Sequence, residues 1–179
     1  MTALVTEATP TFPAVRRLLS GARAVGVPVV HNTMGLPAVP SAPPNSPLAS
    51  ILARRSAESG TDDGARGAEV IAAIGLEDSD YVVERHHGMA AFPGTELDSV
   101  LRALRVETIV ATGVSLNLGI IALAADAVSL GYRVVVATDA VAGTPREYGE
   151  AVIANTLSVL ATRLKVDEIL AVWAAVPPP

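Results

Sequence analysis

The sequence predicts a three-layer α/β/α domain with a central parallel sheet of about six strands. Short apolar runs alternate with helix-length segments, which is typical of a parallel sheet covered by helices. Half of the 179 residues are hydrophobic and only 3% are aromatic, a composition that favours a densely packed domain over a disordered chain. Because this length supports one full core, residues 1–179 are interpreted as a single domain.

The apolar runs and helical spacings place the elements in order. The first strand is followed by a helix with Leu18, Leu19 and Ala22 at helical spacing and Gly26 as its stop. A later helix can be capped by Thr95. Strands are expected at 3–6, 27–31, 81–84, 108–111, 133–137 and 164–166, and helices at 13–25, 95–104, 116–130, 146–162 and 166–173.

Between the second and third strands, residues 33–67 form a Pro-rich excursion with Ser, Asn and Gly. A short helix is expected within it at 48–55. Loops of this length inside a compact domain are usually lids or other functional segments.

Charge and cysteine content exclude several classes of function. The net charge is −5, and the Lys and Arg residues are scattered rather than gathered in the basic stripe that nucleic acid requires. Neither a membrane-spanning run nor a secretory signal is evident, so a cytoplasmic location is expected. With no Cys, disulfides and thiolate metal sites are ruled out. The high apolar content suggests a homo-oligomer.

In an open parallel sheet, catalytic and ligand-binding residues lie at the carboxyl ends of the strands. Polar side chains follow five of the expected strands. They are Glu7, His31, Asn32, the segment 84–87, the segment 112–117, Thr138 and Asp139.

Three of these segments resemble the isochorismatase-like hydrolase superfamily. In that superfamily a Thr-Gly-Val turn, here residues 112–114, is followed five residues after the Val by a nucleophilic Cys, a position held here by Gly119. A Lys precedes a Ser-Ala-Phe motif; here Ala-Ala-Phe occupies 90–92 and His86 stands at the Lys position. The strand-end acid, normally Asp, corresponds to Glu7. The likeness covers most of residues 2–173.

The departures from the superfamily pattern favour one kind of reaction. Amidases of this superfamily use an Asp-Lys-Cys triad, and this chain carries Glu7, His86 and Gly119 instead. Isochorismatases proper, which cleave a vinyl ether, also have Gly at the Cys position, and their acid protonates the substrate's double bond. The resemblance therefore implies vinyl-ether-type hydrolysis, with Glu7 as the acid, rather than amide hydrolysis.

Glu7 and His86 are the candidate catalytic residues. A carboxyl group at a buried strand end has a raised pKa and can donate a proton near neutrality; the alternative is a structural salt bridge, for example with Arg85. His86 can relay a proton or supply part of the missing positive charge, or it can simply be a loop residue bonded to backbone. His87 is expected to line the pocket.

The remaining candidates are expected to bind substrate: Asn32, Phe92, Val114, Ser115, Asn117 and Gly119. Ser115 can instead cap the following helix, or act as a nucleophile, although no base stands at the required spacing. The resemblance implies a cis peptide between Val114 and Ser115. No metal or other cofactor is expected, because His31 is interpreted as a packed strand-end residue and no dinucleotide-type Gly-rich loop occurs.

Two classes of function remain open. One is a cysteine-independent hydrolase or related acid/base enzyme acting on a small organic molecule. The other is a non-catalytic homologue that binds a small ligand or serves as an oligomer subunit. The retained polar residues at the strand ends favour the first hypothesis, and the replacement of all three triad positions favours the second.

Overall fold

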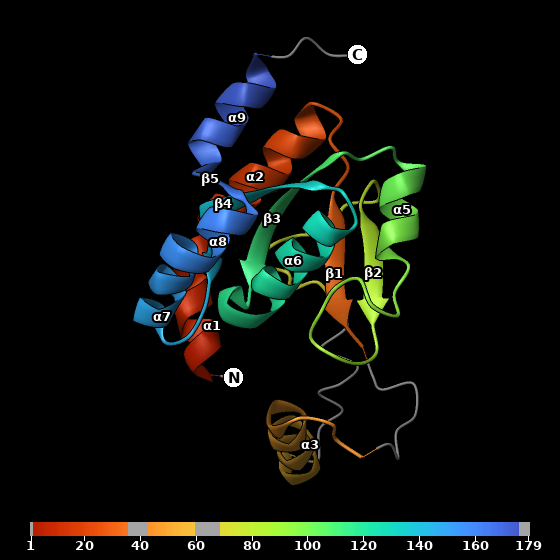
Figure 1. The fold of residues 1–179 in the computed structure, drawn as a ribbon, viewed down its shortest axis with the longest axis vertical. Coiled ribbons are helices and arrows are strands. Elements are labelled where there is room, and N and C mark those ends of the chain that lie inside the picture. Colours follow the sequence, from red (N-terminus) through yellow and green to blue (C-terminus); the bar gives the residue numbers. More distant parts are fainter. Residues whose placement is uncertain (1, 36–42, 60–68, 176–179) are drawn as a thin grey trace.

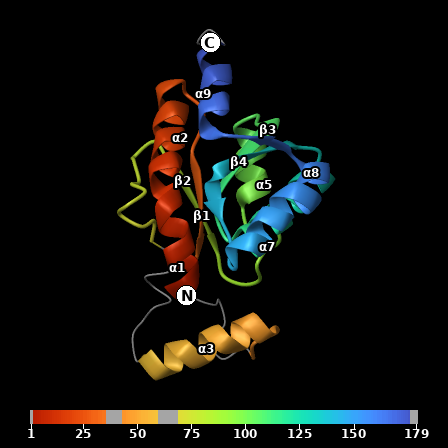
Figure 2. The same cartoon turned by 90° about the vertical axis from the view of Figure 1, so that its left-hand side faces the viewer.

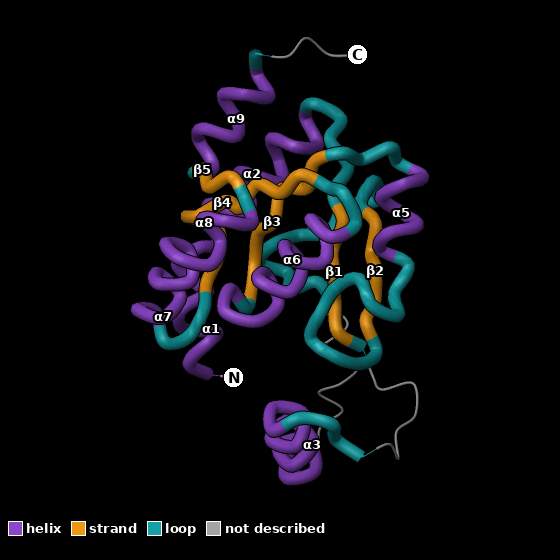
Figure 3. The backbone as a smooth tube through the Cα atoms, in the orientation of Figure 1, coloured by secondary structure: helices purple, strands orange, loops and turns teal. Residues whose placement is uncertain are grey.

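A computed structural model of the chain describes residues 2–35, 43–59 and 69–175. Figure 1 shows its α/β architecture, and Figure 3 separates helices from strands. The strands are β1 (Val30–Met34), β2 (Tyr81–Arg85), β3 (Thr108–Val114), β4 (Arg133–Ala142) and β5 (Thr162–Leu164). The helices are α1 (Thr2–Ala8), the 3-10 turn η1 (Thr9–Thr11), α2 (Phe12–Ala24), α3 (Pro47–Ser59), α5 (Leu97–Ala103), the π-helical η2 (Leu116–Ile120), α6 (Ile121–Ser129), α7 (Arg146–Ala151), the π-helical η3 (Val152–Thr156), α8 (Leu157–Leu160) and α9 (Val166–Ala174).

Helices cover both faces of the strands, which confirms the predicted three-layer α/β class (Figure 2). On one face, α2 and α9 pack on a cluster that includes Val29, Ala137 and Val166. On the other, α5, α6 and α8 enclose a larger cluster around Val136 and Leu157. In both views α3 lies apart from these layers. Within the described residues, none of the helices has the length and apolar character needed to cross a bilayer.

Within the described ranges all strand pairs run parallel, and they form two sheets rather than one. The smaller sheet pairs β1 with β2, and the larger has the order β3-β4-β5. The described residues therefore hold five strands where about six were expected. Parallel pairing brings the carboxyl ends of the strands to the same edge within each sheet.

The missing strand is the first one. Residues 3–6 were expected to be extended, and they form α1 instead. A short apolar run does not distinguish a strand from a helix. Here α1 continues through η1 into α2, so residues 3–6 extend a longer helical segment and do not have to nucleate a helix of their own. The Thr9 and Thr11 hydroxyls donate hydrogen bonds to the Val5 and Ala8 carbonyls near the end of α1.

The second strand begins later than expected. It was placed at 27–31, and β1 runs instead from Val30 to Met34, pairing residue by residue with β2. Pro28 lies before β1, where a missing N–H breaks no ladder bond. The other expected strands and helices are present with shifted ends. The segment 116–130 begins as the π-helical η2, and the expected helix at 146–162 contains η3.

A buried ion cluster joins α2 to the amino ends of β1 and β2. Arg23 donates hydrogen bonds to both carboxylate oxygens of Asp80, at 3.0 and 2.5 Å, and His31 Nε2 lies 2.9 Å from Asp80 Oδ2. The side chain of Asp80 is only 1% exposed. His31 is therefore a packed structural residue, as the sequence suggested.

Asp80 is expected to make stability depend on acid pH. Burial raises the pKa of its carboxyl, but hydrogen bonds from Arg23, the Glu77 N–H and His31 outweigh burial and hold this pKa well below its usual range. The folded pKa is thus lower than the unfolded one, so the stabilisation is present above the unfolded pKa and is lost as pH falls through the folded pKa, between about pH 5 and pH 1. Asp80→Asn should lower the free energy of unfolding by about 3 kcal/mol at pH 7 and flatten its acid dependence in urea titrations.

The matched control is Asp167→Asn. Asp167 pairs with Arg17 at the surface, with 72% of its side chain exposed, and such pairs contribute about 0–1 kcal/mol. Equal losses in the two variants, or an unchanged acid dependence in Asp80→Asn, would show that the cluster does not stabilise the fold.

The packing of the larger core can be tested by truncating Leu157. Its side chain is 0% exposed, whereas Val159 on the same helix is 81% exposed. Leu157→Ala should lower the free energy of unfolding by about 2–5 kcal/mol through lost burial and a residual cavity. Val159→Ala should change it by less than about 0.5 kcal/mol. Denaturant titration measures both, and similar effects would contradict the packing described.

Candidate active site

The carboxyl end of β3 has an irregular backbone. The β3–β4 register shifts between Ala111 and Gly113, and the Thr112 hydroxyl donates a 2.7 Å hydrogen bond to the Ala140 carbonyl. Gly113 has φ +102°, which favours glycine. The peptide between Val114 and Ser115 is cis, which confirms the expectation drawn from the resemblance.

Ser115 stands at the start of η2 and acts through its backbone. Its carbonyl accepts hydrogen bonds from the N–H groups of Leu118 and Ile120, at 3.3 and 3.0 Å. Its side chain makes no capping hydrogen bond, so the predicted side-chain cap is wrong. Val114 is 51% exposed, which leaves this turn accessible to a ligand.

Asn117 and Gly119 lie on η2. The Asn117 amide donates a 3.3 Å hydrogen bond to the Thr144 carbonyl, while its buried Oδ1 has no hydrogen-bond partner. A Cβ added at Gly119 would meet only the Val114 carbonyl oxygen, at 3.8 Å. Position 119 thus has room for a side chain and carries none.

Gly143, just after β4, packs tightly against the start of η2. A Cβ at Gly143 would lie 2.9 Å from Asn117 Oδ1 and 3.1 Å from Leu116 Cβ. The loop after β4 therefore fixes the position of η2 through close backbone approach.

The end of β2 carries three basic side chains in a row, Arg85, His86 and His87. Arg85 is half-buried, and both histidines are exposed. His87 packs on Gly94, where an added Cβ would lie 2.8 Å from the imidazole. His86 thus lies in the loop at the carboxyl end of β2, as the sequence predicts.

Glu7 is not at a strand end. It lies half-buried in the last turn of α1, because residues 3–6 are helical. This helix contacts β3 and β4, and Figure 1 places it near the carboxyl ends of these strands. The salt bridge between Glu7 and Arg85, which was the structural alternative to a catalytic role, is not among the ion pairs of the described residues.

Asn32 and Phe92 also differ from their expected positions. Asn32 lies within β1 rather than after it, because β1 extends to Met34. Phe92 is 7% exposed and stacks on Tyr132 with ring centroids 6.1 Å apart. It belongs to the core cluster around Leu116 and Ile120, so its burial is fully explained by packing.

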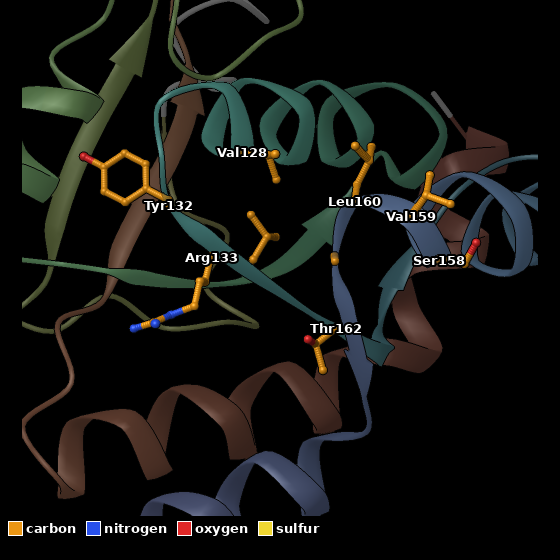
Figure 4. A pocket seen from close by; sticks show the side chains of 9 residues that line it. Val128, Tyr132, Arg133, Ser158, Val159, Leu160 and Thr162 are labelled. Carbon is orange, nitrogen blue, oxygen red and sulfur yellow. The ribbon is translucent and has the colours of Figure 1, made fainter.

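A separate groove lies between α6, the start of β4, α8 and β5 (Figure 4). Its volume is about 450 Å³, and aliphatic side chains such as Val128, Val159 and Leu160 line much of it. Arg133 at its edge bonds to Glu107. None of the predicted site residues lines this groove, and it offers no pair of acid and base groups, so it is not the candidate active site.

Sequence reasoning missed two residues of this region. Gly143 left no sequence signal, because its constraint comes from a residue 26 positions earlier, Asn117. Arg85 was considered only as a partner for Glu7, although its place at the end of an expected strand could have identified it.

Comparison with known proteins identifies the family of this chain. The sequence model of the isochorismatase domain matches residues 2–168. The chain therefore belongs to the isochorismatase family, a group of hydrolase-like α/β proteins.

Individual relatives agree with this. The isochorismatase family protein YwoC of Bacillus subtilis is 36% identical over 102 residues, covering 52% of this chain and 53% of the relative. An isochorismatase family protein from Desulfovibrio vulgaris is 29% identical in structure-based comparison, with a TM-score of 0.80, covering 94% of this chain and 87% of that one. An N-carbamoylsarcosine amidase from Thermoplasma acidophilum is 29% identical, with a TM-score of 0.70 and coverage of 90% and 86%. The chain spans about half the length of the curated relatives it matches.

The contact between Gly143 and η2 can be tested with a matched pair of variants. Gly143→Ala should lower the free energy of unfolding by about 1–3 kcal/mol, because the new methyl group overpacks against Asn117 and Leu116. Gly119→Ala should be neutral or stabilising by up to about 1 kcal/mol, because its methyl group enters open space in a helical segment. Thermal and urea unfolding measure both, and a tolerated Gly143→Ala would contradict the close approach.

Proposed function

We propose that this chain is a cysteine-independent hydrolase or related acid/base enzyme that acts on a small organic molecule. The observation that carries the proposal is Gly119, in a chain without any Cys, at the place where family amidases hold their nucleophile. No thioester can form there. The proposed chemistry at this edge uses a proton donor and water instead.

Vinyl-ether hydrolysis fits these residues better than amide hydrolysis. The Glu7 carboxyl would donate its proton to the terminal carbon of the double bond, which creates an oxygen-stabilised cation. Water then adds to the cationic carbon and returns a proton, and the hemiketal collapses to a ketone and an alcohol. His86 would supply positive charge or relay the proton.

The placement of α1 supports Glu7 in this role. The helix contacts β3, whose end leads into the Val114–Ser115 turn and Gly119. Half-burial of Glu7 withdraws part of its hydration. Backbone amides of this turn would stabilise the negative charge left on the Glu7 carboxylate after it donates its proton. His87, Asn32 and Asn117 would contact the substrate.

A second candidate function is ligand binding without turnover. It is favoured by the replacement of all three triad positions, Glu7, His86 and Gly119. In either case the chain is proposed to be a single-domain, cytoplasmic homo-oligomer, and exposed apolar side chains such as Val5 and Val172 are consistent with subunit contacts.

The decisive comparison is wild type against Glu7→Gln. We expect the wild type to turn over at least one member of a panel of vinyl ethers, amides and esters. Glu7→Gln should lower kcat by about 100-fold or more, because it removes the proton donor. Glu107→Gln, at an exposed ion pair with Arg133, is the control and should leave kcat unchanged.

Circular dichroism and thermal unfolding establish that both variants fold. A folded Glu7→Gln with full activity would eliminate Glu7 as the acid. A wild type inactive on all three substrate classes would favour the binding function.

A further inference from the structure

Arg85 carries a positive charge that the described part of the chain does not balance. Its Nη1 donates a 2.9 Å hydrogen bond to the Gly88 carbonyl, and its Nε is buried without a hydrogen-bond partner. Burial lowers the pKa of its guanidinium. A desolvated guanidinium with an unmet donor is costly unless an anion compensates it.

Arg85 differs in this respect from the other arginines whose side chains the structure describes. Five of them form ion pairs with carboxylates: Arg17, Arg23, Arg102, Arg133 and Arg146. The remainder, Arg16, Arg54, Arg105 and Arg163, are exposed and hydrated. Arg85 alone in this set is withdrawn from water without a carboxylate partner.

The strand register shows what stands beside Arg85. Arg85 pairs with Met34, and Asn32 pairs with Val83, so these four side chains share one face of the small sheet. Val83 is buried in the larger core, whereas Asn32 and Met34 are exposed, Met34 to 43%. The face is therefore closed toward the core and open at its carboxyl end, next to the guanidinium.

We propose that Arg85 binds the carboxylate of a small organic acid at this open end. The Asn32 amide lies diagonally across the strand pair, within reach of the same ligand. Met34 offers an apolar, adaptable surface to the rest of the molecule. The inference rests on the proposed function, since it assigns a substrate class to the same edge of the fold.

The fixed charge and the donor geometry of Arg85 favour a carboxylate over a phosphate monoester. The planar donors of the guanidinium match the two carboxylate oxygens, and the proposed function already assigns the neighbouring His86 to the proton donor. A phosphate monoester carries about −1.5 to −2 at neutral pH, and within β1 and β2 Arg85 is the single Arg or Lys.

The test is calorimetric titration of the full chain with benzoate, its neutral isostere benzamide, and phenyl phosphate. Wild type should bind benzoate at least tenfold more tightly than either of the other two. Arg85→Met should weaken benzoate binding at least tenfold. The benzoate affinity of Arg85→Lys should lie between those of the wild type and Arg85→Met, because lysine keeps the positive charge and lacks the planar guanidinium donors. Arg133→Met, which removes a guanidinium from an exposed pair, should bind benzoate like the wild type.

Each contrary result overturns the proposal. These results are no benzoate binding by wild type, equal binding of benzamide, tighter binding of phenyl phosphate, or unchanged benzoate binding in a folded Arg85→Met or Arg85→Lys. Because Arg85→Met removes a contact to Gly88 and can unfold the loop, Arg85→Lys provides the second variant. Glu7→Gln should still bind benzoate, so a failure of the acid assignment is distinguishable from a failure of the carboxylate site.

Discussion

Parallel pairing of the strands is the constraint on which the candidate site depends. Parallel ladders align the carboxyl ends of β3, β4 and β5 at one edge, and those of β1 and β2 likewise. The register shift after Ala111 then moves the end of β3 toward the loop after β4. Because Gly143 lacks a side chain, that loop approaches η2 within contact distance and fixes Asn117 and Gly119. The position of the candidate site is thus determined mainly by backbone geometry.

The sequence predicted this edge well where local chemistry determined structure. The layer class and the strand at the end of which Thr112 and Gly113 lie are confirmed. The cis peptide before Ser115 is also confirmed, but it was implied by the family resemblance and not by local chemistry. The prediction failed at residues 3–6, because a short apolar run is compatible with both the helical and the strand period. The neighbouring helix then favoured the helical state. Sequence reasoning could not find Gly143, whose role is a long-range steric contact. Nor could it find the unbalanced charge of Arg85, which depends on burial that no local pattern encodes.

The helical state of residues 3–6 also changes how the proposed acid, Glu7, is held in place. A strand-end carboxyl would be held by a ladder of backbone hydrogen bonds, whereas a carboxyl in the last turn of α1 is positioned by how that helix packs on β3 and β4. Because α1 continues through η1 into α2, the position of Glu7 depends on how this helical run packs, including the contact of the buried Ala8. Changes in the packing of α1 would therefore move the proposed acid relative to the ends of β3 and β4.

Loss of the sulfur places a demand on the rest of the site. A cysteine enzyme holds its substrate covalently during part of the cycle, and an acid-catalysed enzyme must hold it by non-covalent contacts throughout. The reacting bond must then be oriented by an anchor away from the proton donor, and a charged anchor in a partly desolvated position is stronger than a neutral one. The proposed anchor, Arg85, fits this requirement because it is half-buried, lacks a carboxylate partner among the described residues, and stands on a separate sheet from β3. The proposed acid, Glu7 on α1, and this proposed anchor on the smaller sheet would then act on opposite ends of one small molecule.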